Sequence, residues 1–141
     1  MTILLRSAVL ALPLLASPAL ALADINITLD HGAVYQTKKS ADPTQGFIQI
    51  HNSGSDPDML IGWNCSIAAT TTLVGADGQK LDSLIIPPGQ TVTLSAKGPH
   101  LALQDLSYNV EQGSILPCSF TFQDVGQIGG YLNSEPAPKA P

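Results

Sequence analysis

The side chains of this sequence with donor atoms suited to metal chemistry are few and widely spaced. Imidazole nitrogen binds copper, zinc and iron, whereas thiolate and thioether sulfur favour Cu(I) and other soft ions. We expect any metal chemistry to depend on which of these side chains the fold brings together. Apart from the initiating methionine, they are His31, His51, His100, Met59, Cys65 and Cys118.

Catalytic and cofactor-binding motifs are missing from the sequence. There is no G-x-S-x-G nucleophile elbow, no H-E-x-x-H zinc motif, no P-loop and no dinucleotide-binding fingerprint. A blue-copper site needs two histidines, a cysteine and usually an axial methionine. The segment "SFTFQDVGQIGG" that follows Cys118 contains neither histidine nor methionine, which excludes an electron-transfer site of the exported cupredoxin type. We therefore do not expect an enzyme.

The first 23 residues are typical of a secretory signal peptide. Arg6 provides a short positive region, "SAVLALPLLA" an apolar region, and "ALA" at positions 21–23 a small-residue cleavage site. We expect cleavage after Ala23, export, and no membrane span afterwards. The alternative is a retained N-terminal anchor, although the apolar run is short for a bilayer.

The charge of the mature chain limits its partners. Removing Arg6 leaves five lysines against eleven acidic residues and no arginine. Lysine and arginine neutralise phosphates, so neither nucleic acid nor an anionic membrane surface is an expected partner.

Cys65 and Cys118 remain in the mature chain. An even number of cysteines in an exported protein indicates a disulfide. Two thiolates that hold a metal ion are the alternative, although their spacing fits no usual metal motif.

Short runs rich in Ile, Val, Thr and Phe, separated by turn residues, indicate an all-β domain. We predict eight or nine strands in one Greek-key β-sandwich of the immunoglobulin-like kind, with a small closed barrel as the alternative. The domain is expected over residues 24–132. The Pro-rich segment 133–141, "NSEPAPKAP", is expected to be disordered. The expected strands include "INITL", "GFIQIHN", "MLIGWNC", "AATTTLV", "KLDSLII", "TVTLS", "HLALQDL" and "PCSFTF".

Alternation within these runs predicts which side chains share a face. Leu101 and Leu103 should face the core, with His100 and Ala102 on the opposite face. Cys118 falls on the same side as the phenylalanines of "PCSFTF", as a disulfide in the core requires.

Three segments resemble the periplasmic copper chaperone family PCu(A)C. The main one is "IPPGQTVTLSAKGPHLALQDL", Ile86 to Leu106, which is similar to the family pattern I-P-x-G-x-T-V-x-L-x-x-x-G-x-H-L-M-L-x-x-L. The other two are "GFIQIHNSGSDPDMLIG" and "VEQGSILPCSFTFQDVGQI". The resemblance implies a cupredoxin-like β-sandwich that binds Cu(I) in the periplasm. It also implies delivery to a copper-accepting protein, such as a component of cytochrome oxidase assembly.

The copper ligands of that family, arranged as H-x10-M-x21-H-x-M, are mostly absent here. The third ligand falls on His100 and the fourth on Ala102, which has no donor atom. The first two belong to a hairpin within Ser66 to Pro99, where no histidine or methionine occurs.

The resemblance therefore implies a degraded ligand set with weak or altered copper binding. His100 is the metal ligand that remains, and other donors would have to come from a partner or from weaker candidates. A metal-free accessory module that uses the same sandwich to bind proteins is the alternative. The weaker candidates are His31, His51 and Met59.

Overall fold

The structure, a computed structural model, describes residues 10–18 and 25–139. Residues 10–18 form no helix or strand, and the predicted cleavage point after Ala23 lies outside the described residues. Within the described ranges, no helix has the length and apolar character needed to cross a membrane.

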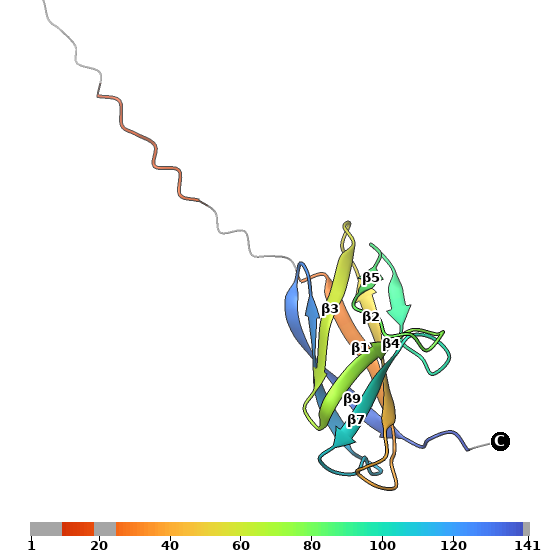
Figure 1. Cartoon of the computed structure of the whole chain (residues 1–141). Coiled ribbons are helices and arrows are strands. Elements are labelled where there is room, and N and C mark those ends of the chain that lie inside the picture. Colours follow the sequence, from red (N-terminus) through yellow and green to blue (C-terminus); the bar gives the residue numbers. More distant parts are fainter. Residues whose placement is uncertain (1–9, 19–24, 140–141) are drawn as a thin grey trace, which may run out of the picture.

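Residues 25–139 fold into strands joined by turns and loops (Figure 1). The strands are β1 (Ile27–Tyr35), β2 (Thr44–Asn52), β3 (Asp58–Cys65), β4 (Ala68–Val74), β5 (Leu84–Ile86), β6 (Thr91–Thr93), β7 (His100–Leu106), β8 (Ile115–Phe122) and β9 (Gly126–Glu135).

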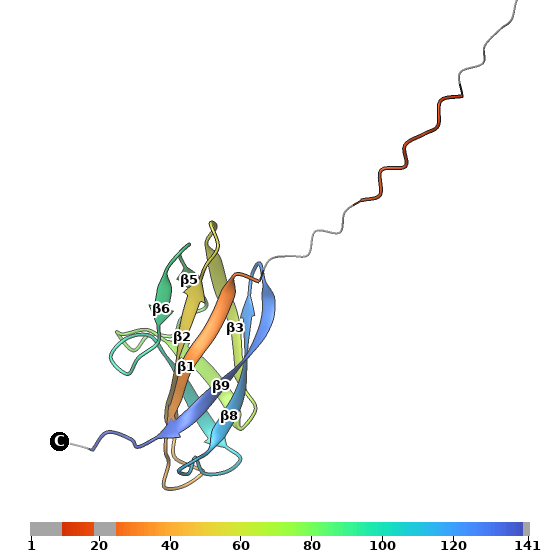
Figure 2. The ribbon, with the colours of Figure 1, turned by 180° about the vertical axis from the view of Figure 1, so that it is seen from behind.

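The strands form one curled sheet in the order β4-β7-β2-β1-β9-β8-β3-β5, with β6 paired to β2. Neighbouring strands are antiparallel except β1 and β9, whose parallel pairing joins the two halves of the sheet. Figure 2 shows β1 and β9 side by side, with β2 on one flank and β8 on the other. The curl turns one face of the sheet inward around a shared core, which confirms the predicted all-β sandwich.

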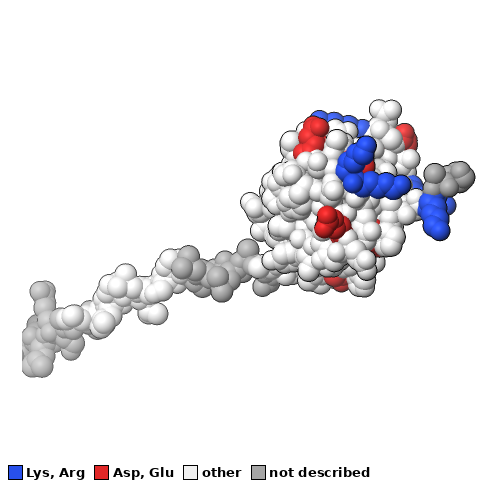
Figure 3. Space-filling view, turned by 90° about the horizontal axis from the view of Figure 1, so that it is seen from below, with Lys and Arg blue, Asp and Glu red and all other residues white. Residues whose placement is uncertain are grey.

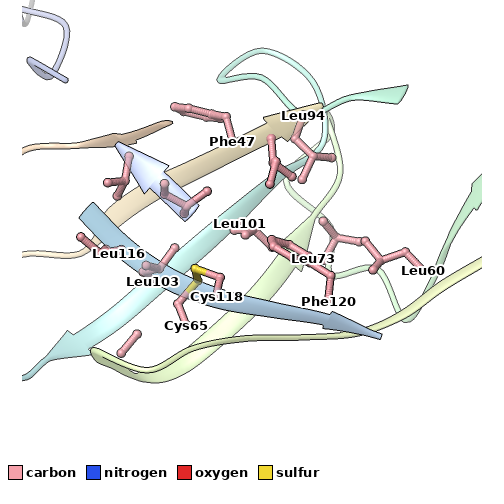
Figure 4. Packing of buried hydrophobic residues seen from close by; sticks show 14 of the residues in the cluster. Phe47, Leu60, Cys65, Leu73, Leu94, Leu101, Leu103, Leu116, Cys118 and Phe120 are labelled. Atoms are coloured by element: carbon pink, nitrogen blue, oxygen red, sulfur yellow. A yellow bond between two sulfur atoms is a disulfide. The ribbon is translucent and has the colours of Figure 1, made fainter. Parts of the chain in front are cut away.

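The core consists of apolar side chains from both halves of the sheet (Figure 4). Ile48 and Ile50 of β2 are buried, as are Leu101 and Leu103 of β7, all at most 1% exposed. Their outward-facing neighbours on each strand, apart from Phe47, are half-buried or exposed, so the alternation of the sequence follows the two faces of the sheet.

Phe47 departs from this alternation. It lies on the outward side of β2, yet it is only 7% exposed. The ring of Tyr35 packs against it edge to face, with 4.9 Å between ring centroids. A second aromatic side chain therefore covers the outer face at this point, which gives that face an apolar region of its own.

The structure departs furthest from the predicted boundaries at three strands. The first strand continues beyond "INITL" to Tyr35, through an irregularity in pairing between Asp30 and Ala33. β9 runs to Glu135, three residues into the predicted tail, because Asn133–Glu135 pair with Ala33–Tyr35. "KLDSLII" forms a strand only over Leu84–Ile86.

Two turns between strands contain a glycine with positive φ. Gly78 of "ADGQ" has φ 83° and Gly89 of "PPGQ" has φ 69°. Glycine occupies this left-handed region without the steric cost that a Cβ atom adds. Each turn is closed by a backbone hydrogen bond, and the second uses Gln90 N and Pro87 O.

A buried carboxylate, Asp58, fixes the beginning of β3 to the turn between β8 and β9. Asp58 is 6% exposed. Its Oδ1 accepts hydrogen bonds from the backbone N–H groups of Met59 (2.7 Å) and Asp124 (3.0 Å). Its Oδ2 accepts a third, from Val125 N at 3.2 Å. Three charge-assisted bonds offset the cost of removing the carboxylate from water.

The charged side chains are mixed in sign on the face seen in Figure 3. Acidic and basic groups there are scattered over a largely uncharged surface. This end of the molecule has no extended field of one sign.

Candidate functional site

His100, the candidate metal ligand, is the first residue of β7. A tight loop over Ser95–Pro99 brings the chain from β6 back into the sheet. Within it, Ser95 N donates to Pro99 O at 2.9 Å and Gly98 N donates to Ser95 O at 3.1 Å. These bonds fix the backbone that immediately precedes the imidazole.

The loop also orients the imidazole ring of His100. Its Nδ1 lies 2.9 Å from the carbonyl oxygen of Gly98. A carbonyl oxygen only accepts, so in this hydrogen bond Nδ1 carries the proton and donates. In the neutral ring Nε2 then has the free lone pair. Metal-binding histidines are commonly fixed in this way, with the second ring nitrogen bonded to a backbone carbonyl.

His100 lines a hollow on the outer face of the sheet, with a volume of about 180 Å³. Ala102 and Gln45 lie on its floor as paired residues of β7 and β2. Pro43 and Thr44 complete the lining. Alanine contributes only a methyl group to this lining.

Donor atoms are scarce around this hollow. Ala102 offers none, and the β4 residues that pair with His100 and Ala102 are Val74 and Thr72. Among the described residues, no group of three His, Cys, Asp or Glu side chains is placed to hold a metal ion. A single imidazole does not provide the converging donors that tight Cu(I) binding requires, so these residues alone do not form a tight copper site.

The structure places His31 away from the hollow, in β1. Its Nδ1 lies 3.0 Å from Asp30 Oδ1, and its side chain is 72% exposed. His31 has φ 51°, because it lies in the irregular stretch where the register of β1 against β2 shifts. It is a surface histidine paired with its neighbouring carboxylate.

His51 lies near the far end of β2, where its Nδ1 is 2.8 Å from Thr91 Oγ1 of β6. β7 pairs with β2 only at Thr44–Gly46. Along β2, His51 lies roughly 16 Å beyond Gly46, the last residue of that pairing. It therefore does not line the hollow beside His100.

Met59 lines a different hollow, of about 130 Å³, together with Pro57, Asp58, Ile85 and Gln123. No residue is common to the two linings. The methionine therefore packs at the β3–β5 edge of the sheet, and the structure does not bring it to His100.

Gln45 and Pro43 are parts of the hollow that the sequence analysis did not identify. The predicted strand "GFIQIHN" begins at Gly46 and leaves both residues outside it. The alternation that places Gln49 and His51 outward extends back to Gln45, and this was the available signal.

Cys65 and Cys118 are joined in a disulfide, which confirms the predicted bridge. The two residues are directly opposite in the β3–β8 ladder, with Cα atoms 4.1 Å apart. Both are buried, at 0% and 5% exposure. Neither thiol is free. The bridge lies in the core, as Figure 4 shows, on the opposite face of the sheet from the hollow.

Comparison with known families identifies the chain. Residues 27–129 match the family described as "LpqE-like: Putative lipoprotein LpqE-like". The chain belongs to the LpqE-like family. No curated protein matches the sequence.

Solved structures show that this member of the LpqE-like family has the fold of PCuAC domains. The copper-bound PCuAC domain from PmoF2 is 22% identical, with a TM-score of 0.71 over 79% of this chain and 94% of that domain. The apo PCuAC domain from PmoF1 is 20% identical, with a TM-score of 0.72 over 79% of this chain and 95% of that domain. CuI-DR1885 from Deinococcus radiodurans is 18% identical, with a TM-score of 0.60 over 76% of this chain and 78% of that one. The resemblance in the sequence is confirmed at the level of the fold.

Proposed function

We propose that this LpqE-like protein is exported to the periplasm and handles Cu(I) there through His100, with weaker binding than a complete PCuAC site provides. One observation carries the proposal. The Gly98 carbonyl holds the imidazole so that its free Nε2 is available beside an open hollow. Membership of a family with the PCuAC fold supports copper as the cargo, because two of the similar structures are described as copper-bound.

Export rests on the signal-like N-terminal segment, the family description and the disulfide. Both cysteines of the sequence are in that disulfide, so neither is available for attachment of a lipid. The family description therefore supports export more directly than it supports an anchor on this chain.

The proposed role is binding and delivery, without catalysis. A copper-accepting protein, such as a component of cytochrome oxidase assembly, is the partner that we propose. A site with few ligands suits transfer, because release of the ion breaks few bonds.

A competition titration of Cu(I) against a chromophoric chelator tests the proposal. The protein is the mature chain, Asp24 to Pro141, and we expect it to bind one ion. His100→Ala should abolish this binding. His51→Ala is the matched control, because it removes another half-buried imidazole whose Nδ1 is also hydrogen-bonded. Equal binding by all three proteins would refute the assignment to His100.

A metal-free accessory module is the second candidate function. The observation that favours it is Ala102, which lies in the hollow where a second donor would be needed. If neither the wild-type protein nor any variant competes for Cu(I), this second function replaces the first.

A further inference from the structure

The large apolar side chains that are exposed within the described strands lie in one half of the sheet. They belong to β9, β8, β3 and β5, which are consecutive in the strand order. Figure 2 shows β9, β8 and β3 side by side. We call the outward-pointing side chains of these four strands the apolar face. Its large exposed members are Tyr131, Ile115, Ile85 and Ile61.

The apolar face is also uncharged over most of its extent. Within these four strands, as far as the structure describes them, the charged residues are Asp58, which is buried, and Glu135, at the end of β9. The chain as a whole carries a net charge of −5. Two copies therefore repel each other over most of their surfaces and least at this face. The Asp30–His31 pair lies on β1, the next strand beyond β9, and forms a polar rim.

Tyr131 and Gly129 give the apolar face a projection and a space next to each other. They lie two positions apart on β9 and so point to the same side, roughly 7 Å apart at Cα. The Tyr131 side chain is 67% exposed. A Cβ atom on Gly129 would meet nothing within 4 Å. Sheets that pack face to face lie about 10 Å apart, so a large side chain on one sheet needs a small residue opposite it on the other.

A second copy of the chain supplies that small residue. A two-fold axis that is parallel to the sheet, perpendicular to β9 and placed over Gly130 turns the second copy onto the first and reverses the direction of its β9. Tyr131 of each copy then lies over Gly129 of the other. Such a contact uses the same residues on both copies and closes on itself, so association ends at a dimer.

We propose that the apolar face is the dimer interface of this protein, and that its partner is a second copy of the chain. The inference is independent of the proposed copper function. The hollow beside His100 lies on the outer face of β2 and β7, in the other half of the sheet. The dimer therefore leaves that hollow open to solvent.

The size of the face indicates a weak dimer. Four strands of about eight residues cover roughly 19 by 26 Å, which is about 500 Å² in projection. A standard interface buries about 800 Å² of each partner, and weak, transient contacts bury less. The short β5 reduces the area further, whereas the relief of the side chains increases it. We expect a dissociation constant on the order of 10–100 µM.

Sedimentation velocity of the mature chain, Asp24 to Pro141, from about 10 µM to about 1 mM tests the proposal. We expect a reversible equilibrium between monomer and dimer. Raising NaCl from about 10 mM to about 300 mM should strengthen the dimer at least about threefold, because salt screens the repulsion between two acidic copies. A chain that stays monomeric at about 1 mM, a dimer that salt weakens, or a series of larger species would overturn the proposal.

Two lysine substitutions separate the effect of the face from that of the net charge. Tyr131→Lys and Gln104→Lys change the net charge equally, and both positions are exposed. Gln104 lies on β7, in the other half of the sheet. Tyr131→Lys should weaken the dimer at least about tenfold, whereas Gln104→Lys should leave it unchanged or slightly stronger. Equal effects of the two substitutions would show that the interface lies elsewhere.

Gly129→Val tests the packing of Tyr131 against the second copy. The fold accepts this side chain, because a Cβ atom on Gly129 meets open space and valine suits a strand. Valine fills the space that Tyr131 of the second copy occupies, so the dimer should weaken at least about tenfold. Thermal unfolding of the dilute monomer, followed by circular dichroism, should stay at or above that of the wild-type protein. A dimer of wild-type affinity would refute the two-fold arrangement.

Discussion

Adjacent glycines in β9 provide a matched test of the packing in this structure. Gly129 and Gly130 point to opposite faces of the sheet. A Cβ atom on Gly130 would lie 3.0 Å from Ile48 Cδ1, 3.1 Å from Phe120 Cε2 and 3.3 Å from Leu29 Cδ1. A Cβ atom on Gly129 would meet nothing within 4 Å. One methyl group is therefore added to a filled core in the first case and to open space in the second.

The magnitudes follow from these contacts. Overpacking a core by one methyl group costs about 1–3 kcal/mol. Replacing glycine by alanine in a strand also gains about 0.5–1 kcal/mol, because it reduces the freedom of the unfolded chain. We expect Gly129→Ala to raise the free energy of unfolding by about 0.5 kcal/mol. We expect Gly130→Ala to lower it by about 1.5 kcal/mol, a difference of about 2 kcal/mol between the variants.

Urea unfolding, followed by the fluorescence of the single tryptophan, Trp63, measures this difference. With a slope of about 1–2 kcal/mol per molar urea, the midpoints of the two variants should differ by about 1–2 M. The slopes themselves should be equal, because the surface exposed on unfolding is unchanged. Equal midpoints, or a less stable Gly129→Ala, would show that the core does not lie on the side of β9 that we describe.

Three further changes test other parts of the structure. Asp58→Ala should lower the free energy of unfolding by about 3 kcal/mol, because three backbone N–H groups lose a charged acceptor. Replacing the exposed Asp56 by alanine should change it by less than about 0.5 kcal/mol. Equal losses of stability in thermal melts of the two variants would contradict the role given to Asp58. Replacing Cys65 and Cys118 together by alanine should lower it by about 4 kcal/mol through the freedom restored to the unfolded chain; a loss below about 1 kcal/mol in urea would refute this account. Gly32→Ala should destabilise the fold by more than about 2 kcal/mol, because its Cβ would collide with a backbone carbonyl of β9. If circular dichroism shows that this variant melts at the same temperature as the wild-type protein, β1 and β9 are not packed this closely.

Local patterns in the sequence were sufficient to predict most of the strands. The predicted "HLALQDL" and "AATTTLV" coincide with β7 and β4. Alternating side chains favour a strand with one buried face wherever it lies in the fold, so the pattern is visible in a short segment. The disulfide was predicted from the sequence as well, since two cysteines in a chain expected to be exported leave one pairing.

Burial and pairing between distant segments were harder to predict. The alternation of β2 puts Phe47 on the outward face, but its burial depends on Tyr35 from a neighbouring strand. The end of β9 is polar and precedes a Pro-rich segment, which is typical of a disordered tail. Its strand conformation depends on parallel pairing with Ala33–Tyr35, a segment far away in the sequence.

The sequence by itself determined the donor atoms of this protein. His100 is present, and the position two residues later, where the PCu(A)C pattern has a methionine ligand, is Ala102. The tertiary structure decided where those atoms lie. It holds Nδ1 of His100 on the Gly98 carbonyl and places Ala102 beside Gln45 of another strand. It also places Met59 in a separate hollow. Composition follows from the chain alone, whereas a site requires distances between segments that only the folded sheet fixes.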